Sequence, residues 1–530
     1  MAPHRIDRAE WPPDTSVQLA EQTVGGLLRE QAERSGDRTA LVATGHDGRA
    51  GRWAYTELLD TAARIAGRLL ALTEPGGRVA LWAPNVAEWP LVQYAASLAG
   101  VTLVAINPAL RPAELEYVLG LSGASVLLHA DRARNYDMAE VAASVARAVP
   151  GVRQVISLAD TDRLYGTAVS PDERSAPGSP AMMQFTSGTT GNPKGVLLAH
   201  RSLVNNARLT MLVAEVEPGA VAVAPLPTFH TAGCVISTLG PAFLGGTMVL
   251  IEKFDPVAVL GAMTTEHASV LMSVPTVLDA VLHAALDSGA AAPALTTVLV
   301  GASTVSRTMI EQVRETFGAA VHNLYGQTEL SPVLSLTRRS DPAEDLVTSV
   351  GRPLPHTGAR IVDPETGEVA PLGVSGEICA RGYNQMIEYV DDAEATAATV
   401  DPGGWLHTGD LGSMDERGMI TLSGRLKELI IRGGENISPA EVEVALAAHP
   451  DVAESAVIGL PDERWGEIVA AVLTTRRPPT EDLEQRLTEH CLDRLAPFKT
   501  PVRWFFVDEL PHTPSGKVQK FVLRDQLASG

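Results

Sequence analysis

Two patterns of apolar residues alternate along roughly the first two thirds of the chain. Apolar residues spaced three or four apart, as from Tyr55 to Leu72, predict amphipathic helices. Short apolar runs, such as Arg78 to Trp82 and Thr297 to Gly301, predict strands. Strands that alternate with helices are typical of a mostly parallel sheet covered by helices on both faces. The pattern therefore predicts an α/β fold.

The pattern changes character in the last third of the chain. From about residue 346 to residue 423, short strands separated by turns predict a small antiparallel β unit. Residues 425–530 then mix strands and helices, which predicts a separate α+β domain of ordinary size. Within that domain, Ser438 and Glu441 have the spacing of a capping box at the start of a helix.

A loop rich in glycine, serine and threonine separates two strand-like segments at Phe185-Thr-Ser-Gly-Thr-Thr-Gly-Asn-Pro-Lys-Gly-Val196. Glycines let the backbone approach a ligand closely, and successive N–H groups can form an anion-binding concavity. The loop therefore predicts a grip on nucleotide phosphates, with a polar hairpin turn as the alternative. It differs from the usual P-loop because Pro193, instead of glycine, precedes Lys194.

Three further polar segments follow predicted strands, at residues 227–230, 301–303 and 326–329. Ligands of open α/β sheets bind beyond the carboxyl ends of the strands. We therefore expect these segments and the glycine-rich loop to converge on one crevice.

Length, charge and cysteine content narrow the class of protein. A chain of 530 residues is too long for one ordinary core, so more than one domain is expected. The formal net charge of −21 argues against nucleic acid or an anionic membrane as a general partner. Three widely spaced cysteines exclude a disulfide framework and suit a reducing compartment. With no signal-like N-terminus and no long apolar run, we expect a cytoplasmic protein without a transmembrane segment.

Seven separated segments have a distinctive order and spacing: Phe185–Val196, Pro225–His230, Tyr325–Glu329, Thr408–Asp410, Gly424–Arg425, Gly433–Ile437 and Pro514–Lys517. Together they resemble the adenylate-forming superfamily, in its branch of acyl- and aryl-CoA synthetases. The superfamily also includes adenylation domains of nonribosomal synthetases and firefly-type luciferases. The resemblance covers nearly the whole chain, and the order and spacing make the set specific although each motif alone is weak.

The resemblance implies a large N-terminal domain at residues 1–424 and a mobile α+β lid at residues 428–530. Residues 425–427 would be the hinge between them, with Lys427 absorbing the change in backbone angles; a solvated linker lysine is the alternative. Within the large domain the resemblance implies two doubly wound α/β subdomains and a small β-barrel subdomain. Their approximate bounds are 1–175, 176–345 and 346–424.

The resemblance also implies a reaction in two steps. A fatty or aryl carboxylic acid attacks the α-phosphate of ATP, in the presence of Mg²⁺, and gives an acyl-adenylate and pyrophosphate. The thiol of coenzyme A then attacks the acyl carbon and releases AMP. A stand-alone ligase that loads the phosphopantetheine of an acyl carrier protein would use the same steps. The sequence leaves that alternative open, as it does the choice between monomer and homodimer; a nucleotide- or acyl-binding protein without turnover is a third hypothesis.

By the same resemblance, four groups of residues would bind the nucleotide. Glu329 would be the Mg²⁺-associated carboxylate, and Thr328 would contact the α-phosphate. Asp410 would accept hydrogen bonds from both ribose hydroxyls, beside Arg425. The triphosphate loop would comprise Thr186, Ser187, Gly188, Thr189, Thr190, Gly191 and Lys194, and the adenine site Gly301, Ala302, Ser303, Tyr325, Gly326 and Gln327.

The remaining assignments concern the acid and the thiol. Lys517 resembles the adenylation lysine, whose ammonium offsets repulsion between the acid and the α-phosphate. His230 would border the path of carboxylate and thiol, with a buried structural histidine as the alternative; the lack of Asp there puts recognition of an α-amine in doubt. Near the pantetheine tunnel would lie Gly433, Gly434 and Glu435. The pocket for an apolar acid would include Ala232, Gly233, Ile236, Val300, Leu330 and Pro332.

Overall fold

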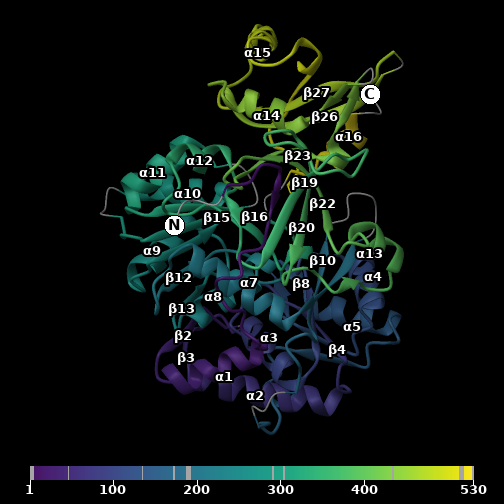
Figure 1. Ribbon diagram of the computed structural model, residues 1–530. Helices are drawn as coiled ribbons and strands as arrows, with labels where there is room; N and C mark the ends of the chain where they lie inside the picture. Colours follow the sequence, from purple (N-terminus) through teal and green to yellow (C-terminus); the bar gives the residue numbers. More distant parts are fainter. Residues whose placement is uncertain are drawn as a thin grey trace. The chain divides into compact units, whose positions relative to one another are not determined.

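The chain folds into two units, each made from segments that are separated in the sequence (Figure 1). Unit 1 contains residues 1–10, 360–379 and 407–530, and unit 2 contains residues 11–359 and 380–406. The domain bounds and the hinge expected from the sequence stay predictions. The computed structural model describes residues 5–45, 47–133, 135–170, 174–186, 193–288, 292–301, 305–432, 435–462, 464–512 and 518–527.

Unit 2 contains a seven-stranded sheet that carries the glycine-rich loop. In spatial order its strands are β21 (Glu388–Tyr389), β11 (Lys194–Ala199), β10 (Pro180–Thr186), β5 (Thr102–Ile106), β4 (Arg78–Trp82), β6 (Val126–His129) and β9 (Gln154–Ser157). The five strands from β10 to β9 are parallel, and β11 runs antiparallel to β10. The helices and the small hairpin of this region are α2 (Tyr55–Leu72), α3 (Glu88–Ala99), α4 (Pro112–Ser122), β7 (Arg132–Ala133), β8 (Tyr136–Asp137), α5 (Met138–Ala148), α6 (Thr161–Leu164) and α7 (His200–Val213).

The second sheet of unit 2 has nine strands. In spatial order they are β18 (Arg352–Pro353), β17 (Val333–Leu336), β16 (Ala320–Gly326), β15 (Thr297–Gly301), β14 (Val270–Ser273), β12 (Val221–Ala224), β13 (Thr247–Leu250), β2 (Thr39–Thr44) and β3 (Ala50–Ala54). The six strands from β16 to β2 are parallel, so their carboxyl ends lie along one edge. The helices of this region are α1 (Val24–Ser35), the π-helical turn η1 (Ala232–Ser237), α8 (Thr238–Phe243), α9 (Pro256–Thr265), α10 (Pro275–Asp287), α11 (Arg307–Phe317), the 3₁₀ turn η2 (Thr328–Leu330) and α12 (Ala343–Thr348).

The sequence predicts a subdomain boundary near residue 175, but each of the two sheets contains strands from both sides of that residue. Strands β10 and β11 belong to the first sheet, where Met182 pairs with Leu103. Strand β2 belongs to the second sheet, where Leu41 pairs with Met248. That boundary therefore does not separate the sheets, because apolar strands pair with whichever open edge satisfies their backbone groups.

A third sheet has five strands. Its order is β1 (Glu10–Trp11), β19 (Thr357–Val362), β20 (Gly376–Gly382), β22 (Leu406–Met414) and β23 (Ile420–Arg425). Strands β22 and β23 form an antiparallel pair that ends with Asp410 opposite Arg425. The short helix α13 (Ala393–Thr399) precedes β22 in the chain.

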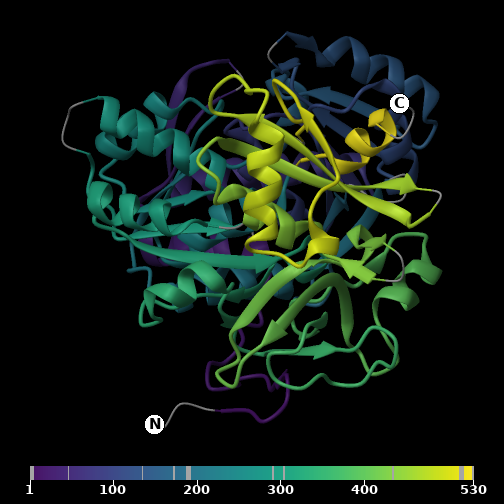
Figure 2. The same ribbon diagram turned by 90° about the horizontal axis from the view of Figure 1, so that it is seen from above.

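The C-terminal part of unit 1 is a sheet with helices packed against it (Figure 2). Ile430, Val442, Leu446 and Leu487 are buried together in its core. The strands are β24 (Ile430–Arg432), β25 (Glu435–Ile437), β26 (Val452–Asp462), β27 (Gly466–Thr475) and β28 (Arg503–Phe506). The helical elements are the 3₁₀ turn η3 (Leu426–Glu428), α14 (Pro439–Ala447), α15 (Leu483–Leu492), the 3₁₀ turn η4 (Pro497–Lys499) and α16 (Lys520–Leu527).

The capping box predicted at the start of α14 is wrong. Ser438 occupies the N-cap position, but its side chain accepts no bond from the helix. Its hydroxyl donates to the carbonyl of Ser423 in β23 instead. Glu441 forms an ion pair of 2.7 Å with Lys499. Tertiary partners have therefore replaced both local bonds, an alternative that local spacing does not reveal.

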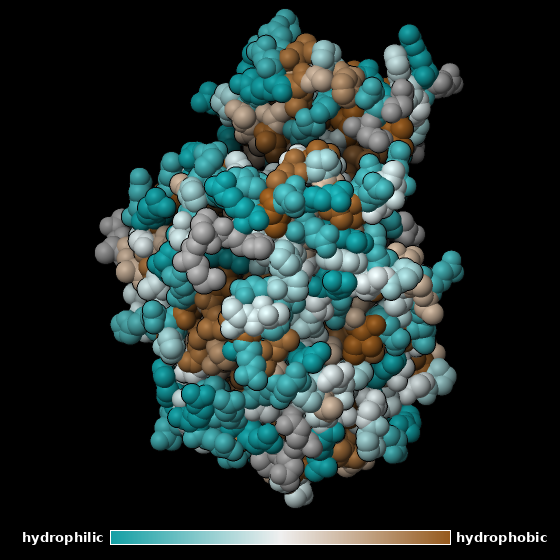
Figure 3. Space-filling model, in the orientation of Figure 1, coloured by the Kyte–Doolittle hydropathy of each residue, from teal (hydrophilic) through white to brown (hydrophobic). Residues whose placement is uncertain are grey.

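Hydrophilic side chains cover most of the face seen in Figure 3, with apolar patches between them. The exposed large apolar residues include Val257, Val444 and Phe521. Scattered residues of this kind are normal on the surface of a globular protein. None of the helices in the described part of the chain combines the length and apolar composition that a bilayer crossing needs.

His200, the first residue of α7, is fully buried between α1 and α3. Its Nδ1 accepts the N–H of Val24 at 3.4 Å and lies 3.5 Å from the hydroxyl of Ser97. Burial lowers the pKa of His200 from 6.5 to about 4. Because the folded pKa lies below the unfolded one, the unfolded chain binds the proton more tightly. Stability is therefore lost as the pH falls from about 6.5 towards 4.

We predict that His200→Asn makes the folded protein less sensitive to mild acid. The wild type loses up to about 3 kcal/mol through this group between pH 7 and pH 4, and the variant, which has no group to titrate there, does not. Thermal unfolding of both proteins over this pH range measures the difference. The exposed His283, changed to Asn, is the control; the prediction is wrong if all three proteins lose melting temperature equally.

Candidate active site

The hairpin of β10 and β11 holds the two ends of the glycine-rich loop together. Thr186 pairs with Lys194 in the strand register, and Phe185 pairs with Gly195. The two strands expected on either side of the loop are therefore confirmed, and two of the predicted phosphate contacts, Thr186 and Lys194, lie opposite each other. The other members of that group lie outside the described residues; they are Ser187, Gly188, Thr189, Thr190 and Gly191.

Lys194 lies over the ring of Tyr389, with its Nζ 4.7 Å from the ring centroid. A ring face carries the negative part of the aromatic quadrupole and attracts an ammonium at this distance. Tyr389 reaches this position because β21 pairs with β11, with Val196 opposite Tyr389. The lysine at the end of the loop is thus held by a residue that the sequence analysis assigned no role.

Glu329 lies in the 3₁₀ turn η2, directly after β16, and only 8% of the residue is exposed. Its Oε1 accepts the hydroxyl of Tyr389 at 2.7 Å. Burial, and then the neighbouring Glu329, raise the pKa of Tyr389, so the hydroxyl keeps its proton and remains a donor. Thr328, in the same turn, is also buried. A buried carboxylate with oxygen to spare fits the ligand preference of Mg²⁺.

The residues predicted to contact adenine come together at the ends of β15 and β16. Gly301 pairs with Leu324, the residue before Tyr325. At Gly326 the backbone passes so close to Pro332 that an added Cβ would lie 1.9 Å from the carbonyl oxygen of Pro332. Gln327 donates its N–H to that same carbonyl at 2.9 Å. Ala302 and Ser303 lie outside the described residues.

His230 ends a turn that follows β12, on the same sheet edge as Gly301 and Gly326. Its Nδ1 accepts the N–H of Ala232 at 3.3 Å, which orients the ring. Gly233 packs so tightly in η1 that a Cβ would lie 2.2 Å from the carbonyl oxygen of Pro227. The predicted acid pocket stays a prediction; of its members, Ile236, Val300 and Leu330 are buried.

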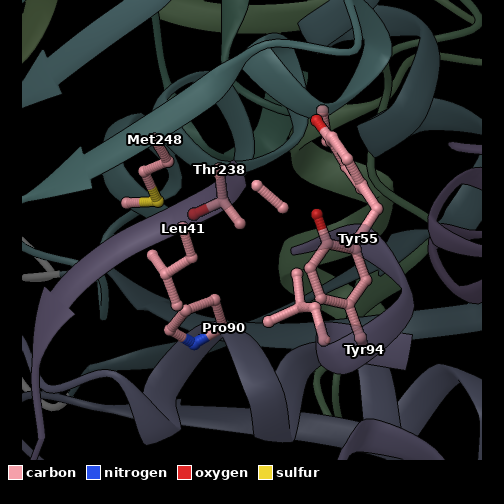
Figure 4. Close-up of a pocket in the computed structure, with 9 residues that line it drawn as sticks. Leu41, Tyr55, Pro90, Tyr94, Thr238 and Met248 are labelled. Atoms are coloured by element: carbon pink, nitrogen blue, oxygen red, sulfur yellow. The ribbon is translucent and has the colours of Figure 1, made fainter. Parts of the chain in front are cut away.

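A small cavity lies elsewhere in unit 2, between α2, α3, β2 and α8 (Figure 4). Tyr55, Tyr94, Leu41, Pro90, Thr238 and Met248 are among the residues that line it. Its volume of about 10 Å³ leaves room for about one water molecule. None of the predicted site residues lines it.

In unit 1, Asp410 and Arg425 form an ion pair across strands β22 and β23. Arg425 Nε lies 3.0 Å from Asp410 Oδ1, and the Asp410 side chain is 10% exposed against 44% for Arg425. The register of the two strands brings these residues opposite each other. The structure therefore joins the two predicted ribose contacts, while their role in binding ribose stays a prediction.

Glu377, in β20, contacts the part of β22 that leads to Asp410. One oxygen, Oε2, lies 2.7 Å from His407 Nδ1, and the other accepts the N–H of Gly409 at 3.0 Å. The possible metal ligands of Glu377, Cys379 and His407 all lie within 4.8 Å of one another. The carboxylate is nevertheless satisfied by His407 and Gly409, so an ion is not needed to explain the cluster. The sequence analysis missed this role, although His407 directly precedes Thr408-Gly-Asp410.

The remaining predicted residues of unit 1 are exposed or lie outside the described part of the chain. Lys427 is exposed in η3. Glu435 is exposed at the start of β25, opposite Arg432. Gly433, Gly434 and Lys517 lie outside the described residues.

Comparison with known proteins gives two matches to protein-family models. Residues 28–390 match the model of the AMP-binding enzymes, and residues 441–517 match the C-terminal domain of the AMP-binding enzymes. Among relatives, the putative acyl-CoA synthetase YngI of Bacillus subtilis is 34% identical over 96% of this chain and 98% of its own. The mitochondrial medium-chain acyl-CoA ligase ACSF2 of Rattus norvegicus is 34% identical over 97% of this chain and 89% of its own.

A solved structure shares the fold. The o-succinylbenzoate CoA synthetase of Bacillus subtilis, in complex with the acyl-adenylate intermediate, superposes with a TM-score of 0.81 at 30% identity. The match covers 96% of this chain and 98% of that one. The family models and the full-length relatives agree, and the expectation drawn from the separated motifs is confirmed. The chain belongs to the AMP-binding enzymes, a family of the adenylate-forming superfamily.

Proposed function

We propose that this protein is an AMP-forming acyl-CoA synthetase, which converts a carboxylic acid to an acyl-adenylate and then to a coenzyme A thioester. The observation that carries the proposal is the buried carboxylate of Glu329, which shares Tyr389 with the lysine of the glycine-rich loop. A full-length relative named as an acyl-CoA synthetase and a structural neighbour that holds an acyl-adenylate support it.

In the first step, the chain would bind and orient ATP. Thr186 and Lys194 would contact the β- and γ-phosphates, and Glu329 with Thr328 would face the α-phosphate. Mg²⁺ held by Glu329 and phosphate oxygens would neutralise part of the triphosphate charge. The carboxylate oxygen of the acid attacks the α-phosphorus, and the bond to pyrophosphate breaks. Fixing the reactants in line removes the cost of bringing them together.

Unit 1 carries further residues to which the proposal assigns roles. Asp410, an acceptor of two hydrogen bonds, would hold the ribose hydroxyls. Lys517 would bring an ammonium between the acid and the α-phosphate, where it offsets their repulsion. In the second step the thiolate of coenzyme A attacks the acyl carbon, and AMP leaves with the oxygen that linked it to the acyl group. Lys427, as hinge, would let Lys517 withdraw and Gly433 to Glu435 approach the thiol.

The acid is proposed to be apolar, either fatty or aryl. The predicted pocket residues are small or aliphatic. His230 occupies the position where a relative that activates α-amino acids would usually have an aspartate to pair with the ammonium of its substrate. Two of the proteins compared above differ in this respect, since one is named as a medium-chain acyl-CoA ligase and the other as an o-succinylbenzoate CoA synthetase. A place in fatty acid metabolism and in the cytoplasm is part of the same proposal.

We predict that the purified protein releases pyrophosphate from ATP only when a suitable acid is present. A panel of saturated fatty acids and of aryl acids, assayed with and without coenzyme A, identifies the acid by pyrophosphate release and thioester formation. Comparing free coenzyme A with a phosphopantetheinylated carrier protein identifies the thiol. A thioester on coenzyme A supports the proposal, transfer only to the carrier supports the alternative ligase, and neither product with any acid contradicts both.

Lys517→Ala is expected to separate the two steps. Adenylation should fall by about 10²- to 10³-fold, because one charge that stabilises the transition state is lost. Thioester formation from chemically supplied acyl-adenylate should stay within about threefold of the wild type. Acid-dependent pyrophosphate exchange measures the first step, and thiol consumption measures the second. Equal losses in both steps would mean that Lys517 does not act mainly in adenylation.

Asp410→Asn is expected to weaken ATP binding by about 10- to 100-fold, because two hydrogen bonds to a charged acceptor become bonds to a neutral one. The matched control is Glu416→Gln, an exposed acid of the same sheet region, whose side chain is 46% exposed. Titration with ATP measures both variants. The ribose assignment fails if the two variants bind ATP equally well.

A further inference from the structure

Residues 386–390, which we name the strap, connect the Glu329 turn to the hairpin of the glycine-rich loop. Three backbone hydrogen bonds join them, and all of them lie within unit 2. In each bond, 2.8 Å long, an N–H of the strap donates to a backbone carbonyl. The N–H of Met386 donates to the carbonyl of Glu329, that of Ile387 to Leu197 and that of Val390 to Gly195. The strap therefore fixes the distance between the predicted cation ligand and the predicted phosphate loop.

Tyr389 is the residue of the strap whose side chain contacts both predicted functional groups. Its hydroxyl donates to Glu329 Oε1 at 2.7 Å, and its ring lies 4.7 Å from Lys194 Nζ. A phenol presents a positive O–H end and a negative ring face. The O–H of Tyr389 faces the carboxylate of Glu329, and its ring face lies under the ammonium of Lys194. Both neighbours therefore favour the same placement of the ring.

The hydroxyl bond selects one orientation of the Glu329 carboxylate. Among the described residues, Tyr389 is the one hydrogen-bond donor to this carboxylate, so its second oxygen, Oε2, has no donor among them. Tyr389 is 7% exposed, so this hydrogen bond lies in the interior of unit 2.

We propose that Tyr389 is a positioning residue for the adenylation step, which orients Glu329 towards the divalent cation and holds Lys194 for the triphosphate. The inference rests on the proposed function for the identity of the ligand. It assigns no chemical step to Tyr389 itself. A purely structural role is the alternative, since the backbone bonds of the strap alone could anchor it.

Tyr389→Phe separates these two roles, because it keeps the ring under Lys194 and removes only the bond to Glu329. Loss of a group that orients a metal ligand typically weakens metal binding by about 10- to 100-fold. We expect half-saturation by Mg²⁺ in pyrophosphate exchange to rise by about 10-fold, with kcat at saturating Mg²⁺ within about threefold of the wild type. Tyr389→Leu, which also loses the ring, should raise the KM for ATP as well.

Tyr55→Phe is the matched control. Tyr55 is also a buried tyrosine of unit 2, and its hydroxyl donates to the carbonyl of Gly246 at the same distance of 2.7 Å. The residue lines the small cavity of Figure 4, where none of the predicted site residues lies. Both Phe variants should lose similar thermal stability, but only Tyr389→Phe should change the dependence on Mg²⁺.

A binding measurement tests the same point without turnover. Electron paramagnetic resonance of Mn²⁺ with ATP should show about 10-fold weaker binding to Tyr389→Phe than to the wild type or Tyr55→Phe. In a Glu329→Ala background the same substitution should have no further effect, because its partner is gone.

The outcomes distinguish the two proposals. If the wild type shows no acid-dependent exchange with any acid, the proposed function fails, and the Mn²⁺ measurement still decides the role of Tyr389. If the wild type is active and Tyr389→Phe matches Tyr55→Phe in both Mg²⁺ dependence and Mn²⁺ binding, Tyr389 is structural. An equal effect of Tyr389→Phe with and without Glu329 also overturns the inference.

Discussion

The parallel pairing of β12, β14, β15 and β16 is the constraint on which the candidate site in unit 2 depends. Parallel strands must all end at the same edge of a sheet, so the segments that follow them are neighbours whatever their distance in the sequence. Gly301 and Gly326 are the last residues of β15 and β16, while His230 follows β12 and the Glu329 turn follows β16. The glycine-rich hairpin belongs to the other sheet and needs a separate connection to this edge, which the strap around Tyr389 provides.

Two of the predicted functional residues are buried carboxylates. Glu329 and Asp410 are each less than one tenth exposed, and a buried carboxylate is costly unless donors satisfy it. Tyr389 donates a hydrogen bond to Glu329, and Arg425 forms an ion pair with Asp410, so each buried charge has a polar or charged partner.

Much of this arrangement could be predicted from the sequence, because it depends on local patterns. Apolar runs identified β4 and β15, helical spacing identified α2, and the motif set identified the family. The exchange of β2 and β10 between sheets could not be predicted, because strand pairing depends on distant edges. The same holds for Tyr389 and Glu377, whose contacts join residues 60 and 30 positions apart. Ser438 shows the converse, since the local spacing predicted a capping bond and a tertiary partner took its place.

The central claim is that an acyl-adenylate links the two steps, and oxygen transfer tests it most directly. A substrate acid labelled with ¹⁸O in both carboxylate oxygens is turned over with ATP and coenzyme A, and the AMP is analysed by mass spectrometry. Because the carboxylate oxygen attacks the α-phosphorus and stays there when the thiol attacks the acyl carbon, each AMP should carry one ¹⁸O atom. Unlabelled AMP, or ADP with labelled phosphate, would contradict the account.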